Sequence, residues 1–382
     1  MNPYFSPAEY KIRYSRTIEL MKANNLSALF LTSEKNINYL SGCQPFQPWY
    51  STTRPTILII PFEGQPVLVV HAVWKGAAER DSWVSDIREY TNLDGVPKNM
   101  ILSIFNELNL KQSIVGVEIG LEQRMGLPFR DFIAIQDSLK SVEWFDASEM
   151  IWKLRSIKSK AEIECMRKSC SAVMEAFTKV FPKLRPGLTQ ETVVHWLQSA
   201  VSEAGADFGF IIPTWDPETH MSMSCLPSAE RIRSGDFIWV DMGAVYHGYW
   251  CDFCRAVSLG NPTDKTLRLW EAIHRVTMKG VESIKPGVSI RQIVQVCAEE
   301  SKRQGLELNF AAGRMGHSCG LMLTEPPSVT LDETTILEPG MTINLEPGIV
   351  SKNGVFIIEQ NVAVTEDGYD LLSKGPWEIW VV

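Results

Sequence analysis

Short apolar runs alternate with amphipathic segments along the first 150 residues. The segment 7–24 carries apolar side chains at near-helical spacing, which predicts an amphipathic helix. Later runs are short, apolar and bounded by turn residues, which predicts strands. These runs are 28–31, 56–60, 67–70 and 114–117. Strands that alternate with helical segments predict an α/β N-terminal domain.

The rest of the chain has longer helical patterns, separated by two segments with strand character. Ser159 with Glu162 three residues later is a capping-box pattern, and the helix it starts is expected to end near Val180. Further helices are expected at 190–204, 264–284 and 289–304, and strands within 236–258 and 340–365. We therefore expect an α+β C-terminal domain, an antiparallel sheet flanked by helices. The predicted domains are 1–154 and 155–382.

Composition narrows the possible functions. The 382 residues are 45% hydrophobic and 21% charged, which is ordinary for a globular chain of two domains. The net charge is −8 and no Lys/Arg-rich block occurs, which argues against a nucleic-acid partner. No apolar run approaches the ~20 residues of a membrane span, and the N-terminus lacks signal-peptide features. Eight scattered cysteines indicate reduced thiols, so we expect a soluble, cytoplasmic protein.

The first candidate site lies in the apolar and aromatic stretch 236–252. A tight turn centred on Tyr246 and His247 would place Asp241 directly opposite Asp252 on one face of a hairpin. Opposed Cβ atoms lie about 4.5–5.5 Å apart, and like charges at this distance repel each other. A bound divalent cation would remove that cost. For one acidic pair alone, a solvated or salt-bridged hairpin face is the simpler interpretation.

A second acidic pair occurs near the C-terminus. A connection centred between Lys352 and Asn353 would place Glu346 opposite Glu359, each within a largely apolar run. Four carboxylates from two hairpins can hold two divalent ions ~3.5–4 Å apart, as in two-metal hydrolases. His317, in a loop of small residues, is the candidate nitrogen ligand, although a single histidine is more often structural.

These segments resemble the motifs of the pita-bread metallohydrolases, a family that includes methionine aminopeptidase, Xaa-Pro aminopeptidase, prolidase and the metal-free creatinase. The similar segments are 235–255, Gly316 with His317, 346–348, and 358–368. Segments 13–42 and 154–163 are similar to the prolidase/creatinase branch. The resemblance implies a creatinase-like N-terminal domain, a pita-bread catalytic domain and a homodimer.

The resemblance also implies roles for the five candidate ligands. Asp241 would chelate one metal ion, and His317 with Glu346 would bind the other. Asp252 and Glu359 would bridge the two ions. A metal-bridging hydroxide would be the nucleophile and Glu346 the general base. The two ions would be Mn, Zn, Fe or Co, because oxygen ligands with one imidazole do not choose among them.

Three positions depart from the peptidase pattern. Ser224 stands eleven residues before Gly235, and Thr324 stands seven residues after His317, where the peptidases carry histidines. Ile357 stands where prolidase-like members carry an arginine. Donors of this kind contribute ~2.7–4 kcal/mol to transition-state stabilisation. Serine and threonine can still donate a hydrogen bond to a substrate, but they carry no charge at neutral pH.

Aromatic residues add candidate substrate contacts. Trp215 precedes the first hairpin, and Trp49 and Tyr50 lie in an N-terminal loop that reaches the partner subunit's active site in prolidase and creatinase relatives. Aromatic faces bind quaternary or sulfonium cations at about 0.5–2 kcal/mol per contact. With Ser224 and Thr324, these three residues form the predicted substrate-binding set, although packing explains most tryptophans.

Three functions remain open at this point. The first is hydrolysis of an amide or C–N bond in a small substrate, including a non-peptide one. The second is a metal-dependent lyase acting on a zwitterion such as dimethylsulfoniopropionate, although Trp239 replaces a metal-binding Asp of that lyase. The third is an ordinary Xaa-Pro peptidase acting on dipeptides. A non-catalytic binding protein is disfavoured, because all five candidate ligands are present.

Overall fold

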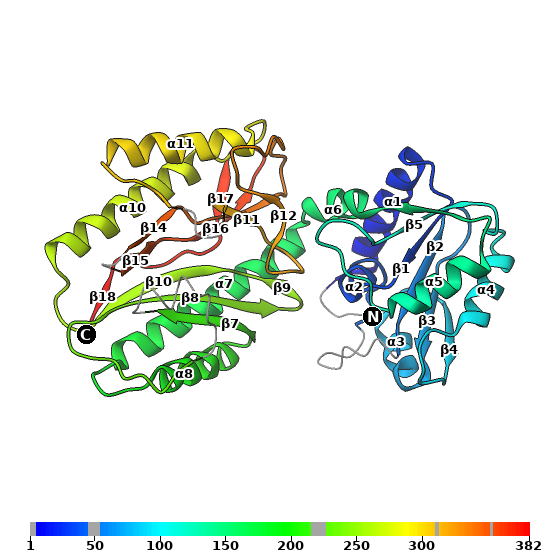
Figure 1. The fold of residues 1–382 in the computed structure, drawn as a ribbon, viewed down its shortest axis with the longest axis horizontal. Helices are drawn as coiled ribbons and strands as arrows, with labels where there is room; N and C mark the ends of the chain where they lie inside the picture. The colour runs from blue at the N-terminus through cyan, green and yellow to red at the C-terminus, as the bar shows by residue number, and fades with distance from the viewer. Residues whose placement is uncertain (1–4, 45–53, 215–226, 310–312, 352–353) are drawn as a thin grey trace. The chain divides into compact units, whose positions relative to one another are not determined.

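The computed structural model describes residues 5–44, 54–214, 227–309, 313–351 and 354–382. The chain divides into two compact units, Met1–Arg155 and Ser156–Val382. Each unit has its own sheet and its own covering helices (Figure 1). Within the described ranges, no helix combines the length and the apolar character that crossing a bilayer requires.

The N-terminal unit is built on a six-stranded mixed sheet with the strand order β4-β3-β2-β1-β5-β6. The strands are β1 (Ala28–Leu31), β2 (Ile57–Pro61), β3 (Val67–His71), β4 (Asp86–Tyr90), β5 (Ile114–Val117) and β6 (Glu143–Asp146). The helices are α1 (Pro7–Ala23), α2 (Glu34–Ser41), α3 (Lys75–Asp81), α4 (Lys98–Glu107), α5 (Phe129–Ser138) and α6 (Ser148–Ser156). β1 pairs antiparallel with β2 and parallel with β5, which confirms the α/β prediction.

One face of this sheet packs against α4 and α5. Ile101, Phe105 and Phe132 from these helices join Phe30 and Val117 from the strands in one buried cluster. The sequence pattern predicts the central strands but not β4 and β6. Both are edge strands with largely exposed or half-exposed side chains, so neither needs an apolar run.

The C-terminal unit contains two five-stranded sheets and a two-stranded hairpin. The first sheet has the order β18-β10-β8-β7, with β9 paired to β8, and the second has the order β12-β11-β13-β16-β17. Their strands are β7 (Asp207–Thr214), β8 (Phe237–Tyr246), β9 (Tyr249–Trp250), β10 (Phe253–Ser258), β11 (Gly316–Ser318), β12 (Glu325–Ser328), β13 (Thr342–Leu345), β16 (Gln360–Val364), β17 (Tyr369–Leu371) and β18 (Trp380–Val381). The hairpin is β14 (Gly348–Ser351) with β15 (Gly354–Ile357).

Long helices cover both sides of these sheets, as the sequence predicts (Figure 1). They are α7 (Lys160–Val180), α8 (Gln190–Glu203), α10 (Asp264–Glu282) and α11 (Ile290–Arg303). α7 begins with the predicted capping box, in which the Ser159 side chain accepts from the Glu162 backbone and Glu162 accepts from the Ser159 backbone. Buried residues of α10 and α11, such as Val276 and Ile293, pack against Leu345 of β13. These two helices therefore cover the second sheet.

Candidate metal centre

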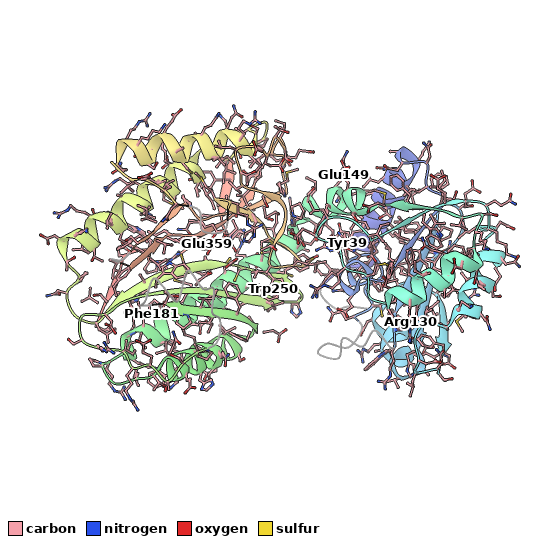
Figure 2. All side chains as sticks on the ribbon, viewed as in Figure 1. Tyr39, Arg130, Glu149, Phe181, Trp250 and Glu359 are labelled. Atoms are coloured by element: carbon pink, nitrogen blue, oxygen red, sulfur yellow. The ribbon has the colours of Figure 1, made fainter. Side chains whose placement is uncertain are left out.

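The five predicted ligands all lie in the C-terminal unit. Asp241 lies within β8 and His317 within β11, and the other three lie next to strand ends. Asp252, His317 and Glu359 are buried, and each has a ligand atom within 4.8 Å of those of the other two. Glu359 lies between the sheets, inside the unit (Figure 2). Asp241 and Glu346 are partly exposed, and the charges of both act on Glu359. The fold therefore brings together side chains from five separate segments.

The register of the first hairpin differs from the prediction. Asp241 pairs with Cys254 rather than with Asp252. His247 and Gly248 form the tight turn, with φ values of 52° and 89°. Positive φ at both central residues is typical of a type I′ turn, and the glycine marks its second position. Moving the turn by one residue shifts the pairing by two, so Asp252 stays on the same face as Asp241 and near it.

The second hairpin has the predicted register. Leu345 stands opposite Gln360 in the pair β13-β16, and Gly348 stands opposite Ile357 in the pair β14-β15. The two pairings are in phase across the junction, so Glu346 comes opposite Glu359 where the chain leaves one ladder and enters the next. Glu346 and Glu359 belong to neither ladder, so their carboxylates can turn toward a common ligand.

The four carboxylates are costly to ionise in this setting. Burial raises the pKa of Asp252 to about 7. Burial also raises the pKa of Glu346 to about 7, and the charges of Asp252 and Asp241 act in the same direction. For Asp241 and Glu359, burial and then neighbouring carboxylates raise the pKa well above the usual range. Without cations, the carboxylates of this cluster therefore favour the protonated form.

Two carboxylate oxygens of the cluster indicate that a ligand is missing. Oδ1 of Asp241 and Oδ1 of Asp252 are buried and accept no hydrogen bond in the described structure. Buried polar atoms are almost always satisfied, so such orphans indicate a missing ligand. Carboxylate oxygens with one imidazole suit Mn, Zn, Fe and Co, and the residues present therefore fit divalent cations.

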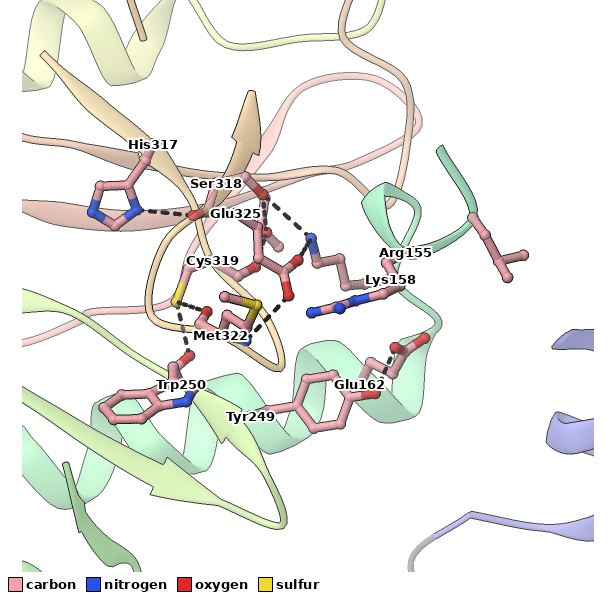
Figure 3. Close-up of polar contacts among 12 residues, drawn as sticks. Arg155, Lys158, Glu162, Tyr249, Trp250, His317, Ser318, Cys319, Met322 and Glu325 are labelled. Atoms are coloured by element: carbon pink, nitrogen blue, oxygen red, sulfur yellow. Dashed lines mark hydrogen bonds and ion pairs between the residues drawn. The ribbon is translucent and has the colours of Figure 1, made fainter. Parts of the chain in front are cut away.

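The orientation of His317 suits a metal ligand. Its Nδ1 lies 2.8 Å from the Ser318 carbonyl oxygen, which can only accept, so Nδ1 carries the proton (Figure 3). Nε2 is then an acceptor, 3.4 Å from Oδ2 of Asp252 and 3.9 Å from Oε1 of Glu346. Burial lowers the pKa of His317, which favours this neutral form. At Gly316, an added Cβ would collide with the Asn344 carbonyl oxygen, so only glycine allows this approach.

Two buried asparagines support the ligands, and sequence reasoning missed both. Asn344 donates from Nδ2 to Oε1 of Glu359, and Asn361 donates from Nδ2 to Oδ1 of Asn344 and to the Asp252 carbonyl oxygen. The Asp252 backbone N–H donates to Oδ1 of Asn361 at 3.0 Å. Asn344 and Asn361 stand opposite each other on β13 and β16. Their positions, two residues from each glutamate, are a signal that the second register could have revealed.

A buried ion pair braces the loop that follows His317. Nζ of Lys158 lies 3.3 Å from Oε2 of Glu325, and the two side chains are 1% and 2% exposed. Lys158 also donates to Oγ of Ser318 at 3.3 Å, and Oε1 of Glu325 accepts from the Met322 backbone at 3.1 Å (Figure 3). The pair thus fixes both ends of the loop between β11 and β12.

Breaking this ion pair is expected to destabilise the protein. Lys158→Met or Glu325→Leu alone removes one partner of the buried pair, which costs about 3–5 kcal/mol. The double variant removes both charges and should recover much of that loss, because a buried pair is often replaceable by apolar side chains. Thermal unfolding of the three variants measures this. Single variants that unfold at the wild-type temperature would show that the pair contributes little.

The raised carboxylate pKa values predict how pH acts on the metal-free protein. For Asp252 and Glu346 the folded-state pKa, about 7, lies above the unfolded value, so folding favours the protonated form. That stability is fully present below about pH 4 and is lost as pH rises through 7. We expect the metal-free protein to unfold at a lower temperature at pH 8 than at pH 5.5. Metal-loaded protein should not show this fall, because deprotonated carboxylates bind the ions; an equal fall with metal would contradict the cluster's role.

The predicted substrate contacts are mostly outside the described residues. Trp49, Tyr50, Trp215 and Ser224 all lie outside the ranges that the structure describes. Thr324 is described and half-buried, and it directly precedes Glu325 of the ion pair. These five assignments stay predictions.

Thr214 is a polar residue of the same region that the sequence did not reveal. Its Oγ1 is buried and has no hydrogen-bond partner in the described structure. On the β7-β8 ladder, Thr214 stands opposite Trp239, and Ile212 stands opposite Asp241. Since residues two apart share a face, Thr214 lies on the face that carries Asp241. It is therefore a further hydroxyl on the side of the sheet that faces the carboxylates.

Comparisons with known proteins cover nearly the whole chain. The model of metallopeptidase family M24 matches residues 164–366, and that of the creatinase/prolidase N-terminal domain matches residues 13–157. An Xaa-Pro dipeptidase of Pyrococcus furiosus is 26% identical over 378 residues, covering 97% of this chain and 99% of that protein. The probable dipeptidase PepE of Mycobacterium tuberculosis is 27% identical over 382 residues, covering 97% and 96%.

Solved structures agree in fold. The dipeptidase PepE from Mycobacterium ulcerans superposes with a TM-score of 0.84 at 25% identity, covering 99% of both chains. An Xaa-Pro dipeptidase from Bacillus anthracis gives a TM-score of 0.84 at 22% identity, covering 98% of this chain and 100% of that one. The second likeness shows the shared two-domain architecture alone.

Proposed function

The chain belongs to metallopeptidase family M24, as a metal-dependent hydrolase with a creatinase/prolidase-type N-terminal domain, and from this premise we propose that it hydrolyses an amide or other C–N bond of a small substrate at a two-metal centre. The observation that carries the proposal is the buried group of Asp252, His317 and Glu359, with two orphaned carboxylate oxygens. Charged carboxylates in such a setting need cations, and the family supplies the chemical context.

We assign each ligand the role that the sequence resemblance implies. Asp241 would hold one ion, His317 with Glu346 would hold the other, and Asp252 with Glu359 would serve both. Divalent cations such as Mn, Zn, Fe or Co, when bound, lower the pKa of water and polarise a carbonyl. Asn344 restrains the Glu359 carboxylate, and Asn361 restrains the Asp252 backbone, so the ligands are held before any ion arrives.

Glu346 is the group placed to move protons. Its side chain is 24% exposed, against 7% for Asp252, so solvent and substrate can reach it. As the attacking water loses a proton, the Glu346 carboxylate accepts it. When the C–N bond breaks, Glu346 returns the proton to the leaving nitrogen. His317 stays neutral because burial lowers its pKa, and its Nδ1–H donates to the Ser318 carbonyl oxygen, which leaves Nε2 free of a proton.

The substrate class is inferred from the relatives and from the replacement of the peptidase histidines in this chain. Several relatives are Xaa-Pro dipeptidases, so an Xaa-Pro dipeptide is the first substrate to test. Ser224 and Thr324 replace the histidines of the peptidase pattern and offer neutral hydroxyls instead. We therefore expect slow turnover of dipeptides and allow a non-peptide amide as the preferred substrate. A homodimer and a cytoplasmic location stay predictions.

The lyase alternative loses support at Trp239. The residue is 2% exposed and packs in the core between β8 and β15. Its Nε1 donates to the Ile357 carbonyl oxygen at 3.0 Å. The side chain that stands in place of an additional metal-binding aspartate is therefore a core residue. We do not propose a lyase.

Isotope incorporation tests the proposal directly. The protein, loaded with Mn²⁺, Zn²⁺ or Co²⁺, is incubated with Ala-Pro in ¹⁸O-labelled water, and the released alanine is analysed by mass spectrometry. Hydrolysis places one solvent oxygen in the new carboxyl group, and a chelator should stop the release. Release that persists after chelation, or alanine without the label, would refute a metal-dependent hydrolysis.

A further inference from the structure

Thr214, the last residue of β7, carries a buried hydroxyl without a partner. The residue is 1% exposed, and its Oγ1 forms no hydrogen bond with any described residue. Other buried threonines satisfy this group locally, since Thr17 and Thr277 each donate to a backbone carbonyl four residues earlier in their helix. A strand offers no such acceptor, because its side chains stand perpendicular to the sheet. The partner of Thr214 must therefore come from another segment or from a ligand.

The β7-β8 ladder makes Thr214 a neighbour of the candidate metal ligand Asp241. Thr214 stands opposite Trp239, and Ile212 stands opposite Asp241. Residues two apart share a face, so Thr214 and Asp241 are diagonal neighbours on one face of the sheet. Cβ atoms at diagonal positions lie somewhat less than about 7–8 Å apart, a separation that a hydroxyl, a carboxylate and one O–H···O bond of ~2.7 Å can span. A rotamer change can therefore join the two groups.

The tryptophan that faces Thr214 cannot satisfy its hydroxyl. An indole has one donor and no acceptor, and Nε1 of Trp239 already donates to the Ile357 carbonyl oxygen at 3.0 Å. β7 is also the edge strand of its sheet, so no described strand pairs with its other side. Of the side chains that the ladder brings beside Thr214, Asp241 is the one that can accept its hydrogen bond.

The two groups are complementary in what each lacks. Thr214 has a buried donor without an acceptor, and Oδ1 of Asp241 is a buried acceptor without a donor. Carboxylates that bind metal ions are usually held by a further hydrogen bond, as the Glu359 carboxylate is held by Asn344. A carboxylate has about four lone-pair sites on its two oxygens, so Asp241 can bind a cation and still accept a hydrogen bond.

We propose that Thr214 is a positioning residue whose hydroxyl donates a hydrogen bond to the Asp241 carboxylate when that carboxylate holds a metal ion. This rests on the proposed two-metal function and deepens it, because it adds a residue that no motif of the chain indicates. Thr214 acts through Asp241 and touches neither substrate nor ion. Its hydrogen bond fixes the direction of the carboxylate and so favours one of the two ions over the other.

Thr214→Val and Thr214→Ser separate the hydroxyl from the shape of the side chain. Valine keeps the volume of threonine and removes the donor, whereas serine keeps the donor. In calorimetric titration of metal-free protein with Mn²⁺, Thr214→Val should bind one of its two ions about 10- to 100-fold more weakly than the wild type, as expected when a metal ligand loses its supporting hydrogen bond. Thr214→Ser should stay close to the wild-type affinity. An equal loss in both variants would overturn the inference.

The stability of the metal-free protein distinguishes positioning from packing. Without metal the Thr214 donor is unsatisfied, so Thr214→Val should raise the unfolding temperature by about 2–4 °C. A lower unfolding temperature would show damaged packing and overturn the inference. Thr17→Val is the matched control, because the Thr17 hydroxyl already donates to the Arg13 carbonyl oxygen in the N-terminal unit. It should lower the unfolding temperature and leave Mn²⁺ affinity unchanged.

The same titration separates this inference from the proposed function. A wild type that binds no ion contradicts the two-metal function and the inference with it. A wild type that binds two ions, beside a Thr214→Val variant that binds both equally well, contradicts only the role of Thr214.

Discussion

Glu346→Gln is expected to lower kcat by about 10²- to 10⁴-fold, the range that a positioned acid–base group contributes. Glutamine keeps the size of the side chain but can neither accept nor return a proton. The residue is also a proposed ligand beside His317, with 3.9 Å between Oε1 and Nε2, so metal affinity should fall as well. Measuring kcat at saturating metal separates the two effects, because added metal restores occupancy but not proton transfer.

The matched control for this substitution is Glu366→Gln. Glu366 is exposed in the turn after β16, and the change removes the same charge far from the proposed chemistry. Its kcat should equal that of the wild type. If Glu346→Gln were as active as Glu366→Gln at saturating metal, Glu346 would be neither the base nor an essential ligand.

Asp252→Asn is expected to have opposite effects on metal binding and on stability. The buried carboxylate is proposed to bridge both ions, so its loss should reduce bound metal from two per chain toward zero. The same change removes one of the mutually repelling charges whose ionisation burial disfavours. The metal-free variant should therefore unfold at a higher temperature than metal-free wild type at pH 8, and the gap should shrink at pH 5.5.

Loss of metal together with higher stability of the metal-free variant would not result from a damaged fold. A misfolded variant loses metal and also loses stability at both pH values. Plasma mass spectrometry for metal content and thermal unfolding of the same samples give both readouts. An Asp252→Asn protein that binds two ions per chain, or that is less stable than wild type without metal at pH 8, would contradict the role assigned to Asp252.

Much of the site can be predicted from the sequence, because side chains alternate between the two faces of a hairpin. Whether two residues share a face therefore depends only on whether the number of positions between them is odd or even. The second register is correct, and Asn344 and Asn361 follow from the same alternation. The first register is wrong by two residues because His247 and Gly248, rather than Tyr246 and His247, form the turn. Since two residues are one full period, the error leaves Asp241 and Asp252 on one face.

The remaining features depend on contacts that no local pattern encodes. Lys158 and Glu325 are separated by 167 positions, and an isolated lysine and glutamate in sequence read as surface charges. The edge strands β4 and β6 are missed because their side chains are partly exposed.

Anomalous diffraction from crystals grown with Mn²⁺ or Zn²⁺ tests the central claim most directly, since it locates and counts bound ions. Two anomalous peaks per chain, both within bonding distance of Asp252 and Glu359 and one also of His317, are the predicted result. A protein that holds no ion there at saturating metal, or whose ions bind elsewhere in the chain, would contradict the account.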